Sequence, residues 1–430
     1  MRIGLEVHVT LPTKSKLFCS CSNGTENPNS AICPICMGMP GSKPMLNAEA
    51  VRLAKTVSLG LGSRISNPMS FVRKVYFYPD LPKSFQITQL DQPIGVGGKV
   101  RLWASGKDIG IRRVQIEEDP ARIIRGDGYS LLDFNRSGSP LIEIVTEPDI
   151  TGEAELKAFV EELLSVLAYS GIPKAEARAD LNISISDSRV EVKNITGISN
   201  MLAAARYEMA RQEAVLRSGG SVAVETRSFD EASMTTESSR EKETDEEYGF
   251  VYEPDLAEYD TGAIAAAKPI IAGELANSIA MRYGLSERTL RELVLYDGAA
   301  LRLLELGVSI NPGVCVAAIE GLKKIGRMGV PEATFRELMV AVANGVKPST
   351  ELVEAIEKGG GKPSKALVDK DRIDAEIIGL INERKELAEQ CRSDAKKLNF
   401  FIGVVVKRCG ADPRYVAARA TELINRALGA

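Results

Sequence analysis

Four of the seven cysteines lie within 18 residues, as a C-x-C pair and a C-x-x-C pair that eleven residues separate. Two close thiol pairs on tight turns can meet around one ion, and Zn²⁺ favours four ligands in a tetrahedron. Four unrelated core cysteines are the alternative, but scattered core cysteines seldom pair in this way. An all-sulfur set leaves no open position, so we predict a structural zinc knuckle at 19–36. Its ligands are Cys19, Cys21, Cys33 and Cys36.

The only histidine of the chain, His8, lies two residues after Glu6. In a strand this spacing places both side chains on the same face, and a carboxylate beside a neutral imidazole suits Mg²⁺ or Mn²⁺. A solvated strand face is the ordinary explanation, but like charges gathered on one face repel unless a cation lies among them. Further acidic positions are Glu117, Glu118 and Asp119 in QIEEDPARI, Glu143, Glu147 and Asp149 in SPLIEIVTEPD, and Asp180 and Glu191.

Basic and aromatic residues recur in two predicted loops, RKVYFYPDLPK (73–83) and DFNRSGSP (133–140). They suit either an ordinary charged surface or a set of phosphate and nucleotide contacts. No usable P-loop is present, because GGGK at 359–362 lacks the first glycine and is followed by Pro363 where Ser or Thr is needed. Any nucleotide chemistry must therefore use another scaffold.

The elements that must position these residues are of two kinds. Up to about residue 260, short β-like runs alternate with turns, and IGLEVHV alternates cleanly between apolar and polar residues. Such strands predict a mostly antiparallel sheet with one face in water. Glu118 shares parity with Val114 and Ile116, so it must lie at a strand end or bulge to reach the polar face. Helices are expected at 153–169 and 198–216, and almost throughout after residue 265, with a hinge at 358–365. The fold class is thus α+β.

Bulk composition excludes several classes of protein. A chain of 430 residues predicts two to four domains, and a net charge of −4 excludes a global basic field. No apolar run reaches membrane-spanning length, and the first residues do not resemble a signal segment. The cysteines are odd in number and clustered, which is typical of reduced thiols. We therefore expect a cytoplasmic protein with no membrane contact.

Several long motifs resemble one known family. They include IGLEVHVTLPTKSKLFCSC, VYFYPDLPKSFQITQLDQPIG, LLDFNRSGSPLIEIVTEPD, EVKNITGISN and ETRSFDE, and they cover roughly residues 3–256. The family is the B subunit (GatB) of the tRNA-dependent amidotransferases, which convert Glu-tRNA(Gln) to Gln-tRNA(Gln) and Asp-tRNA(Asn) to Asn-tRNA(Asn). The resemblance implies a cradle domain with the kinase and transamidase site, then a helical domain and a tRNA-binding tail. The predicted domains are 1–282, 283–358 and 359–430.

The resemblance also implies roles for individual residues. Glu6, His8, Glu118 and Glu143 match the catalytic positions that bind Mg²⁺ (or Mn²⁺), while Asp180 and Glu191 match further acidic positions. The four cysteines match the family's zinc site. The pocket for ATP and the acyl end would be lined by Lys74, Tyr76, Lys83, Asn135 and Arg136. Gly249 replaces an arginine that bacterial members tend to carry, which favours an archaeal-type protein.

The expected activity is that of a carbon–nitrogen ligase with glutamine as amide donor. ATP would phosphorylate the side-chain carboxylate of Glu-tRNA(Gln), Asp-tRNA(Asn) or both, and ammonia from the A subunit, a glutaminase, would then displace phosphate. A small C subunit would complete the heterotrimer. Two other hypotheses are a non-catalytic zinc-knuckle RNA-binding scaffold and a zinc hydrolase. A lone histidine outside an H-x-x-x-H pattern gives the hydrolase little support.

Overall fold

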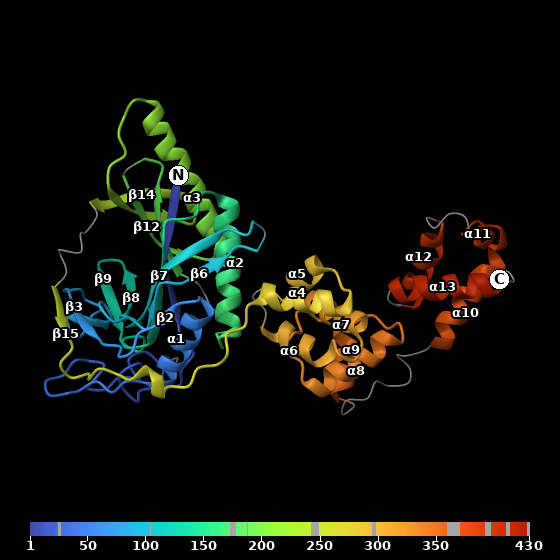
Figure 1. Cartoon of the computed structure of the whole chain (residues 1–430), viewed down its shortest axis with the longest axis horizontal. Helices are drawn as coiled ribbons and strands as arrows, with labels where there is room; N and C mark the ends of the chain where they lie inside the picture. Colours follow the sequence, from blue (N-terminus) through green and yellow to red (C-terminus); the bar gives the residue numbers. More distant parts are fainter. Residues whose placement is uncertain are drawn as a thin grey trace. The chain divides into compact units, whose positions relative to one another are not determined.

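The chain divides into two compact units, Met1–Leu275 and Ala276–Ala430 (Figure 1). The predicted first domain, 1–282, ends a few residues beyond the first unit, and the predicted boundary near 358 falls inside the second unit. The computed structural model describes residues 1–24, 27–103, 105–172, 178–186, 188–241, 249–294, 298–358, 370–391, 397–409 and 413–427.

A ten-stranded sheet dominates the described part of the first unit. Its strands are β1 (Arg2–Thr10), β2 (Arg64–Ile65), β5 (Gly95–Val96), β6 (Lys99–Arg101), β7 (Asp108–Glu118), β10 (Pro140–Thr146), β11 (Arg178–Ser184), β12 (Val190–Thr196), β13 (Glu225–Asp230) and β14 (Thr235–Glu241). Their order is β14-β13-β12-β11-β1-β10-β7-β5-β2, and β6 also pairs with β7. The pairs are antiparallel except β12 with β13, so the predicted α+β class is confirmed.

Two smaller sheets accompany the large one. Strands β3 (Val72–Val75), β4 (Phe85–Thr88) and β15 (Gly249–Tyr252) form a three-stranded antiparallel sheet with β3 in the middle. Strands β8 (Arg122–Gly126) and β9 (Tyr129–Asp133) form a separate two-stranded hairpin. Gly249 pairs with Val75 in β15, an outer strand of the three-stranded sheet.

The apolar core lies on one face of the large sheet. Ile3, Leu5, Val7 and Val9 alternate along β1 and are at most 1% exposed. They join a cluster with apolar residues of α1 (Ala48–Gly60), α2 (Glu153–Tyr169) and α3 (Ile198–Arg217). These helices lie beside the sheet in Figure 1. The two helices predicted at 153–169 and 198–216 are therefore confirmed, and they leave the other face of β1 to its polar residues.

The polar face is not the open, wet surface that strand alternation predicts. Glu6 and His8 are half-buried, whereas Glu117, Glu143 and Asp180 are buried. Side chains of β4 contact this face, since Gln86 and Thr88 donate hydrogen bonds to Glu117. The prediction of a solvated face is thus wrong, because a second layer of polar side chains covers part of the acidic residues.

Helices make up the described chain from residue 272 onward. Their bounds are α4 (Ala272–Tyr283), α5 (Glu287–Val294), α6 (Gly298–Gly307), α7 (Pro312–Lys324), α8 (Glu332–Ala343), α9 (Thr350–Lys358), α10 (Lys370–Glu383), α11 (Lys385–Gln390), α12 (Leu398–Cys409) and α13 (Pro413–Ala427). Residues from α10 to α13 share a hydrophobic cluster that includes Ile377, Phe401 and Val416. The predicted hinge at 358–365 lies outside the described residues except for Lys358. Among the described helices, none is long and apolar enough to cross a membrane.

Candidate active site

His8 and Glu143 face each other across neighbouring strands. β1 pairs with β10 so that His8 is directly opposite Glu143, and Glu143 is in turn opposite Gln115 on β7. Directly paired residues point to the same face of a sheet. His8 Nε2 lies 3.4 Å from Glu143 Oε1. Strand register thus joins two residues that are 135 positions apart in the sequence.

Glu117 completes this first acidic group. It follows Gln115 by two positions on β7 and so shares its face. Thr88 Oγ1 donates to Glu117 Oε1 at 2.6 Å, and Gln115 Nε2 donates to the same oxygen at 2.9 Å. Donor atoms of His8, Glu117 and Glu143 lie within 4.8 Å of one another, a spacing that one divalent cation can bridge.

A second acidic group lies on the same face, toward β12. Glu6 is opposite Asp180 on β11, and Asn182 is opposite Glu191 on β12. Carboxylate oxygens of Glu6, Asp180 and Glu191 also come within 4.8 Å of one another. Asn182 Nδ2 donates to Glu6 Oε1 at 3.0 Å, while the buried Asn182 Oδ1 accepts no hydrogen bond from the described residues. A buried amide oxygen that accepts no hydrogen bond is a suitable ligand for a hard cation such as Mg²⁺.

Lys193 supplies positive charge to the second acidic group. Its Nζ lies 3.5 Å from Asp180 Oδ2 and 3.3 Å from Glu191 Oε1. Burial lowers the pKa of Lys193, but the charges of Asp180 and Glu191 outweigh burial and raise it. The lysine therefore stays protonated and offsets part of the repulsion among the three carboxylates.

Burial and like charge destabilise the ionised carboxylates of the acidic face. Burial raises the pKa of Glu6, and the neighbouring Glu143, Glu191 and Asp180 raise it further. Burial also raises the pKa of Glu117, with Glu143 adding to the effect. Both pKa values are raised because the ionised carboxylates on this face are poorly solvated and repel one another. A divalent cation would relieve that repulsion.

The pair of His8 and Glu143 is the exception, because each stabilises the charge of the other. Burial lowers the pKa of His8, but the hydrogen bond and charge of Glu143 outweigh burial and raise this pKa to about 9. Burial raises the pKa of Glu143, yet His8 outweighs it and the net shift is downward. A cation bound here would replace the proton on the imidazole, since a ligating histidine must be neutral.

Glu118, predicted as a metal ligand, lies in neither acidic group. It is the last residue of β7 and keeps the parity of Val114 and Ile116, so it points away from Glu117. Its Oε1 accepts hydrogen bonds from Lys83 Nζ and from the backbone N–H of Ile87, the latter at 2.8 Å. Glu117 lies on the polar face where Glu118 was predicted to lie, and Glu118 instead bonds to Lys83 and to the backbone of Ile87.

The predicted nucleotide residues separate into two sets. Lys74 on β3 lies close enough to the first group that its charge lowers the pKa of both Glu117 and Glu143. Its Nζ lies over the ring of Tyr76, 5.8 Å from the centroid. Lys83 is instead buried in its ion pair with Glu118. Of these two lysines, Lys74 is the one near the first acidic group.

Asn135 and Arg136 face protein rather than the acidic groups. Asn135 Oδ1 accepts from the backbone N–H of Ala31 at 2.8 Å, and Asn135 Nδ2 donates to Asn27 O at 2.6 Å. Arg136 donates to the carbonyls of Pro120 and Ala121 at 3.0 and 2.9 Å. Both side chains thus connect loops of the protein. The sequence motif did not indicate this structural role.

The four predicted zinc ligands come together. Their sulfur atoms lie within 4.8 Å of one another, and Cys33 Sγ and Cys36 Sγ are 3.9 Å apart. Four sulfurs at about 2.3 Å from a tetrahedral Zn²⁺ lie about 3.8 Å from one another, so this set fits the ion. A hydrogen bond from Cys19, aided by the nearby charge of Lys16, lowers the pKa of Cys36 to about 4. The same hydrogen bond raises the pKa of Cys19, and burial raises that of Cys21 to about 11, so zinc would have to displace protons from these two thiols. A thiolate is the form that binds zinc.

The sequence interpretation assigns no role in these sites to three of their residues. Glu117 belongs to an acidic run, and parity with Gln115 is the signal that selects it over Glu118. Lys193 lies two residues after Glu191, on the same face of β12, and that spacing is the available signal. Lys16 is fully buried with its Nζ 3.6 Å from Cys36 Sγ. No sequence pattern points to it.

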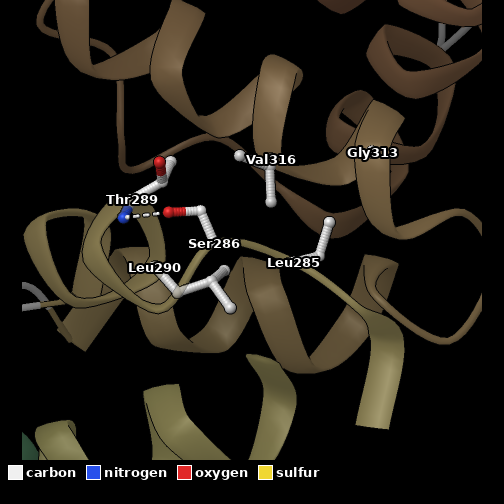
Figure 2. A pocket seen from close by; sticks show the side chains of 6 residues that line it. All are labelled: Leu285, Ser286, Thr289, Leu290, Gly313 and Val316. Atoms are coloured by element: carbon white, nitrogen blue, oxygen red, sulfur yellow. Dashed lines mark hydrogen bonds between the residues drawn. The ribbon is translucent and has the colours of Figure 1, made fainter. Parts of the chain in front are cut away.

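The second unit contains a cavity of about 290 Å³ between α5 and α7, shown in Figure 2. Ser286 Oγ accepts a hydrogen bond from the backbone N–H of Thr289 at 3.4 Å. The cavity's lining has no titratable side chain, so it offers no chemistry comparable to the acidic groups. The lining residues are Leu285, Ser286, Thr289, Leu290, Gly313 and Val316.

Comparison with known proteins identifies the family of this chain. Residues 1–263 match the family described as the GatB/GatE catalytic domain. The B subunit of the aspartyl/glutamyl-tRNA(Asn/Gln) amidotransferase of Sulfurisphaera tokodaii is 36% identical over 477 aligned positions, which cover 100% of this chain and 99% of the relative. The chain belongs to the family of amidotransferase B subunits. The resemblance found in its motifs is therefore confirmed, including the similarity to archaeal members.

Within the family, similarity is higher over a shorter aligned stretch. The B subunit of Methanoregula boonei is 45% identical over 270 positions, 59% of this chain and 56% of the relative. That of Geobacillus thermodenitrificans is 44% identical over 270 positions, 59% of this chain and 57% of the relative. Both acidic groups and the knuckle lie inside the segment that matches the GatB/GatE catalytic domain.

Proposed function

We propose that this chain is the B subunit of a glutamine-dependent amidotransferase that acts on Glu-tRNA(Gln), Asp-tRNA(Asn) or both. It phosphorylates the side-chain carboxylate of the misacylated amino acid with ATP and then replaces phosphate by ammonia. The observation that carries this proposal is the group of His8, Glu117 and Glu143, whose two carboxylates are buried, inside the segment that matches the GatB/GatE catalytic domain.

The chemistry explains why a polar, acid-lined site is needed. A carboxylate does not react with ammonia, because its oxygen is a poor leaving group. In the first step a carboxylate oxygen of the aminoacyl group attacks the γ-phosphorus of ATP, the bond to the bridging oxygen breaks, and ADP leaves. Phosphoryl transfer of this kind depends mainly on positioning and on neutralising charge.

The residues of the acidic face would divide this work. His8, Glu117 and Glu143, with Glu6 nearby, would hold Mg²⁺ or Mn²⁺, which when bound neutralises phosphate charge. Asp180, Glu191 and the Asn182 carbonyl oxygen could hold a second cation in the presence of nucleotide. Lys74 would steady the remaining phosphate charge from β3.

The second step is the attack of ammonia on the acyl carbon of the mixed anhydride. The carbon–oxygen bond to phosphate breaks, an amide forms, and the nitrogen loses a proton. A carboxylate of the acidic face can accept that proton. The acyl phosphate must be kept from water, so a pocket closed by tRNA and the partner proteins is expected.

The partners follow from the same chemistry. A glutaminase, the A subunit, would release ammonia next to this site, and a small C subunit would join the pair into a heterotrimer. The helical tail at 359–430 would bind tRNA. We place the complex in the cytoplasm, where charged tRNA and ATP are available. Zn²⁺ on the four cysteines would be structural, since all four coordination positions are taken by sulfur.

Reconstitution with the A and C subunits tests the proposal. The complex is given γ-labelled ATP, Mg²⁺, and either Glu-tRNA(Gln) or Asp-tRNA(Asn), with glutamine or free ammonium as nitrogen source. We expect labelled phosphate on the aminoacyl group without a nitrogen source, and amide when one is added. tRNA binding without ATP-dependent phosphorylation of either substrate would instead support the RNA-binding scaffold. Comparing the two tRNAs identifies the substrate.

A further inference from the structure

Residues 27–31, between the two cysteine pairs, form hydrogen bonds with the loop at 132–135, which leads to the acidic face. Asn29 donates from its backbone to Asp133 Oδ1 at 3.0 Å and from its side chain to Leu132 O at 3.0 Å. Its Oδ1 accepts from the backbone N–H of Phe134 at 2.8 Å. Together with the two bonds of Asn135 to Asn27 and Ala31, these contacts between 27–31 and 132–135 form what we name the clasp.

The clasp lies at the base of a small hairpin. Residue 133 ends β9, and β8 and β9 form a two-stranded sheet of their own. Such a hairpin is at best marginally stable alone. Lys16, fully buried beside Cys36, adds a hydrogen bond from its Nζ to Phe134 O at 3.2 Å. The knuckle therefore fixes the base of the hairpin from two sides.

A second set of bonds continues from this loop to the end of β7. Arg136 donates to the carbonyls of Pro120 and Ala121. The backbone N–H of Gly138 donates to Asp119 O, and that of Asp119 donates to Ser139 O, both at 2.9 Å. The turn at 119–121 directly follows Glu117 and Glu118. The turn therefore joins the end of the strand that carries Glu117 to the loop that the clasp holds.

We infer that the four-cysteine knuckle positions Glu117, and with it the first acidic group, through the clasp and through the hold of Arg136 on the turn at 119–121. Asn29 is a positioning residue in this chain of contacts, since its bonds go to the loop at 132–134 and not to the acidic group. The inference rests on the proposed function, because Glu117 matters only if the acidic group binds a cation.

Asn29→Gly is the variant that tests the clasp most directly. Asn29 has a φ of +56°, a left-handed conformation that glycine adopts without strain, so the substitution removes the two side-chain bonds and keeps the backbone path. Met234→Gly is the matched control. Met234 also has a φ of +56°, lies in the turn between β13 and β14, and is exposed. It has no part in the clasp.

Three measurements on the full-length chain test the inference: zinc content, hydrogen exchange of peptides spanning 117–121 and 132–139, and Mn²⁺ binding by electron paramagnetic resonance. For Asn29→Gly we expect one zinc per chain, faster exchange in both peptides, and about tenfold weaker Mn²⁺ binding, the lower end of what loss of an outer-shell partner costs. Met234→Gly should match the wild type in all three.

Unchanged Mn²⁺ affinity in Asn29→Gly would overturn the inference, whether or not exchange is faster, because the clasp would then be merely structural. Weaker Mn²⁺ binding with unchanged exchange at 117–121 would also overturn it, because the effect would not pass through the turn. Failure of the wild-type chain to bind Mn²⁺ would remove the proposed function itself, while faster exchange in Asn29→Gly would still establish the clasp.

A double-mutant cycle checks the route. If the knuckle acts through the clasp, Cys33→Ser already loosens residues 27–31, and adding Asn29→Gly weakens Mn²⁺ binding no further. The effects of the two variants are then not additive. If the fold-changes in Mn²⁺ affinity multiply, the two act independently and the inference is wrong.

Discussion

The four-cysteine knuckle and the acidic face gather negative charge in opposite ways. The knuckle takes its four thiols from one segment of 18 residues, at 19–36. The two acidic groups take side chains from β1, β7, β10, β11 and β12, so they exist only when five strands are in register. A short segment can close around an ion with local turns, whereas the acidic face needs the whole first unit. The knuckle is suited to a support, and the face to chemistry.

The two regions also differ in how they balance their charge. Lys16 lies beside Cys36 and is fully buried, so it belongs to the packing of the knuckle. The acidic face has the half-buried Lys193 at one group and His8 at the other. An imidazole can lose its proton and become a ligand, but a protonated lysine cannot. In the group with His8, a metal cation can therefore replace the proton on the imidazole.

Removing His8 should separate the two regions most clearly. We expect His8→Ala to lose the cation of the first group and to slow amide formation about a thousandfold, as loss of several kcal/mol of charge stabilisation implies. The defect should persist when free ammonium replaces glutamine, because it lies in the phosphorylation step. The measurements are amide formation from misacylated tRNA and zinc content, which should stay at one per chain.

Ammonium-dependent turnover at the wild-type rate in His8→Ala would remove the imidazole from the site. Assembly with the A and C subunits serves as the control, since His8 lies on the polar face of β1 and away from the apolar core. A variant that assembles and holds zinc, yet forms no amide, would place the whole loss in the acidic face.

The neighbouring residues Glu117 and Glu118 allow metal binding and structural support to be tested separately. Glu117→Gln should weaken Mn²⁺ binding about a hundredfold, at the upper end for groups around a metal, with little loss of stability. Glu118→Gln should leave the Mn²⁺ affinity of the folded protein near the wild-type value. It deprives the buried Lys83 of its partner and should destabilise folding by about 3–5 kcal/mol. Chemical denaturation and Mn²⁺ titration of both variants test this, and the reverse pattern would restore Glu118 as the ligand.

The sequence predicted these two regions unequally, for a physical reason. Cysteine spacing alone identifies the knuckle, because its geometry is local. Strand parity placed Glu6 and His8 together and required Glu118 to lie at a strand end or bulge to reach the polar face. Glu118 is the last residue of β7, but the strand stays regular there, and Glu117 has the polar parity instead. The alternation of polar residues could not reveal that β4 covers the acidic face, since that contact joins distant parts of the chain.

Asn135 and Arg136 illustrate the same limit. Their motif is conspicuous, and their residue types suit a nucleotide as well as a loop. Only the folded chain shows that Asn135 bonds to residues 27 and 31 and that Arg136 bonds to the turn after β7. The helices at 153–169 and 198–216 were predictable to within a residue because their signals are local periodicity and glycine stops.

Loss of zinc should have a smaller effect on activity than loss of His8. Cys33→Ser breaks the tetrahedral set, so we expect zinc content well below one per chain and a lower melting temperature of the first unit. Turnover should fall about tenfold, less than the hundredfold that a displacement of about 1 Å can cost in a catalytic group. Metal analysis and calorimetry test this. One full zinc per chain in Cys33→Ser would contradict coordination by four cysteines.

Lys193→Met tests whether the second acidic group depends on the positive charge of the lysine. Its effect should be the smallest of these variants. Without the ammonium group, Glu6, Asp180 and Glu191 repel one another, so the metal-free protein should melt about 3 °C lower, as a loss of about 1 kcal/mol implies for a unit of this size. Added Mn²⁺ should restore the melting temperature, since a divalent cation can replace the lost charge. Lys157→Met, on the exposed side of α2, is the control and should change neither value. A Lys193→Met protein that is equally stable with and without Mn²⁺ would mean that these carboxylates need no cation, and that the acidic face has a single metal group.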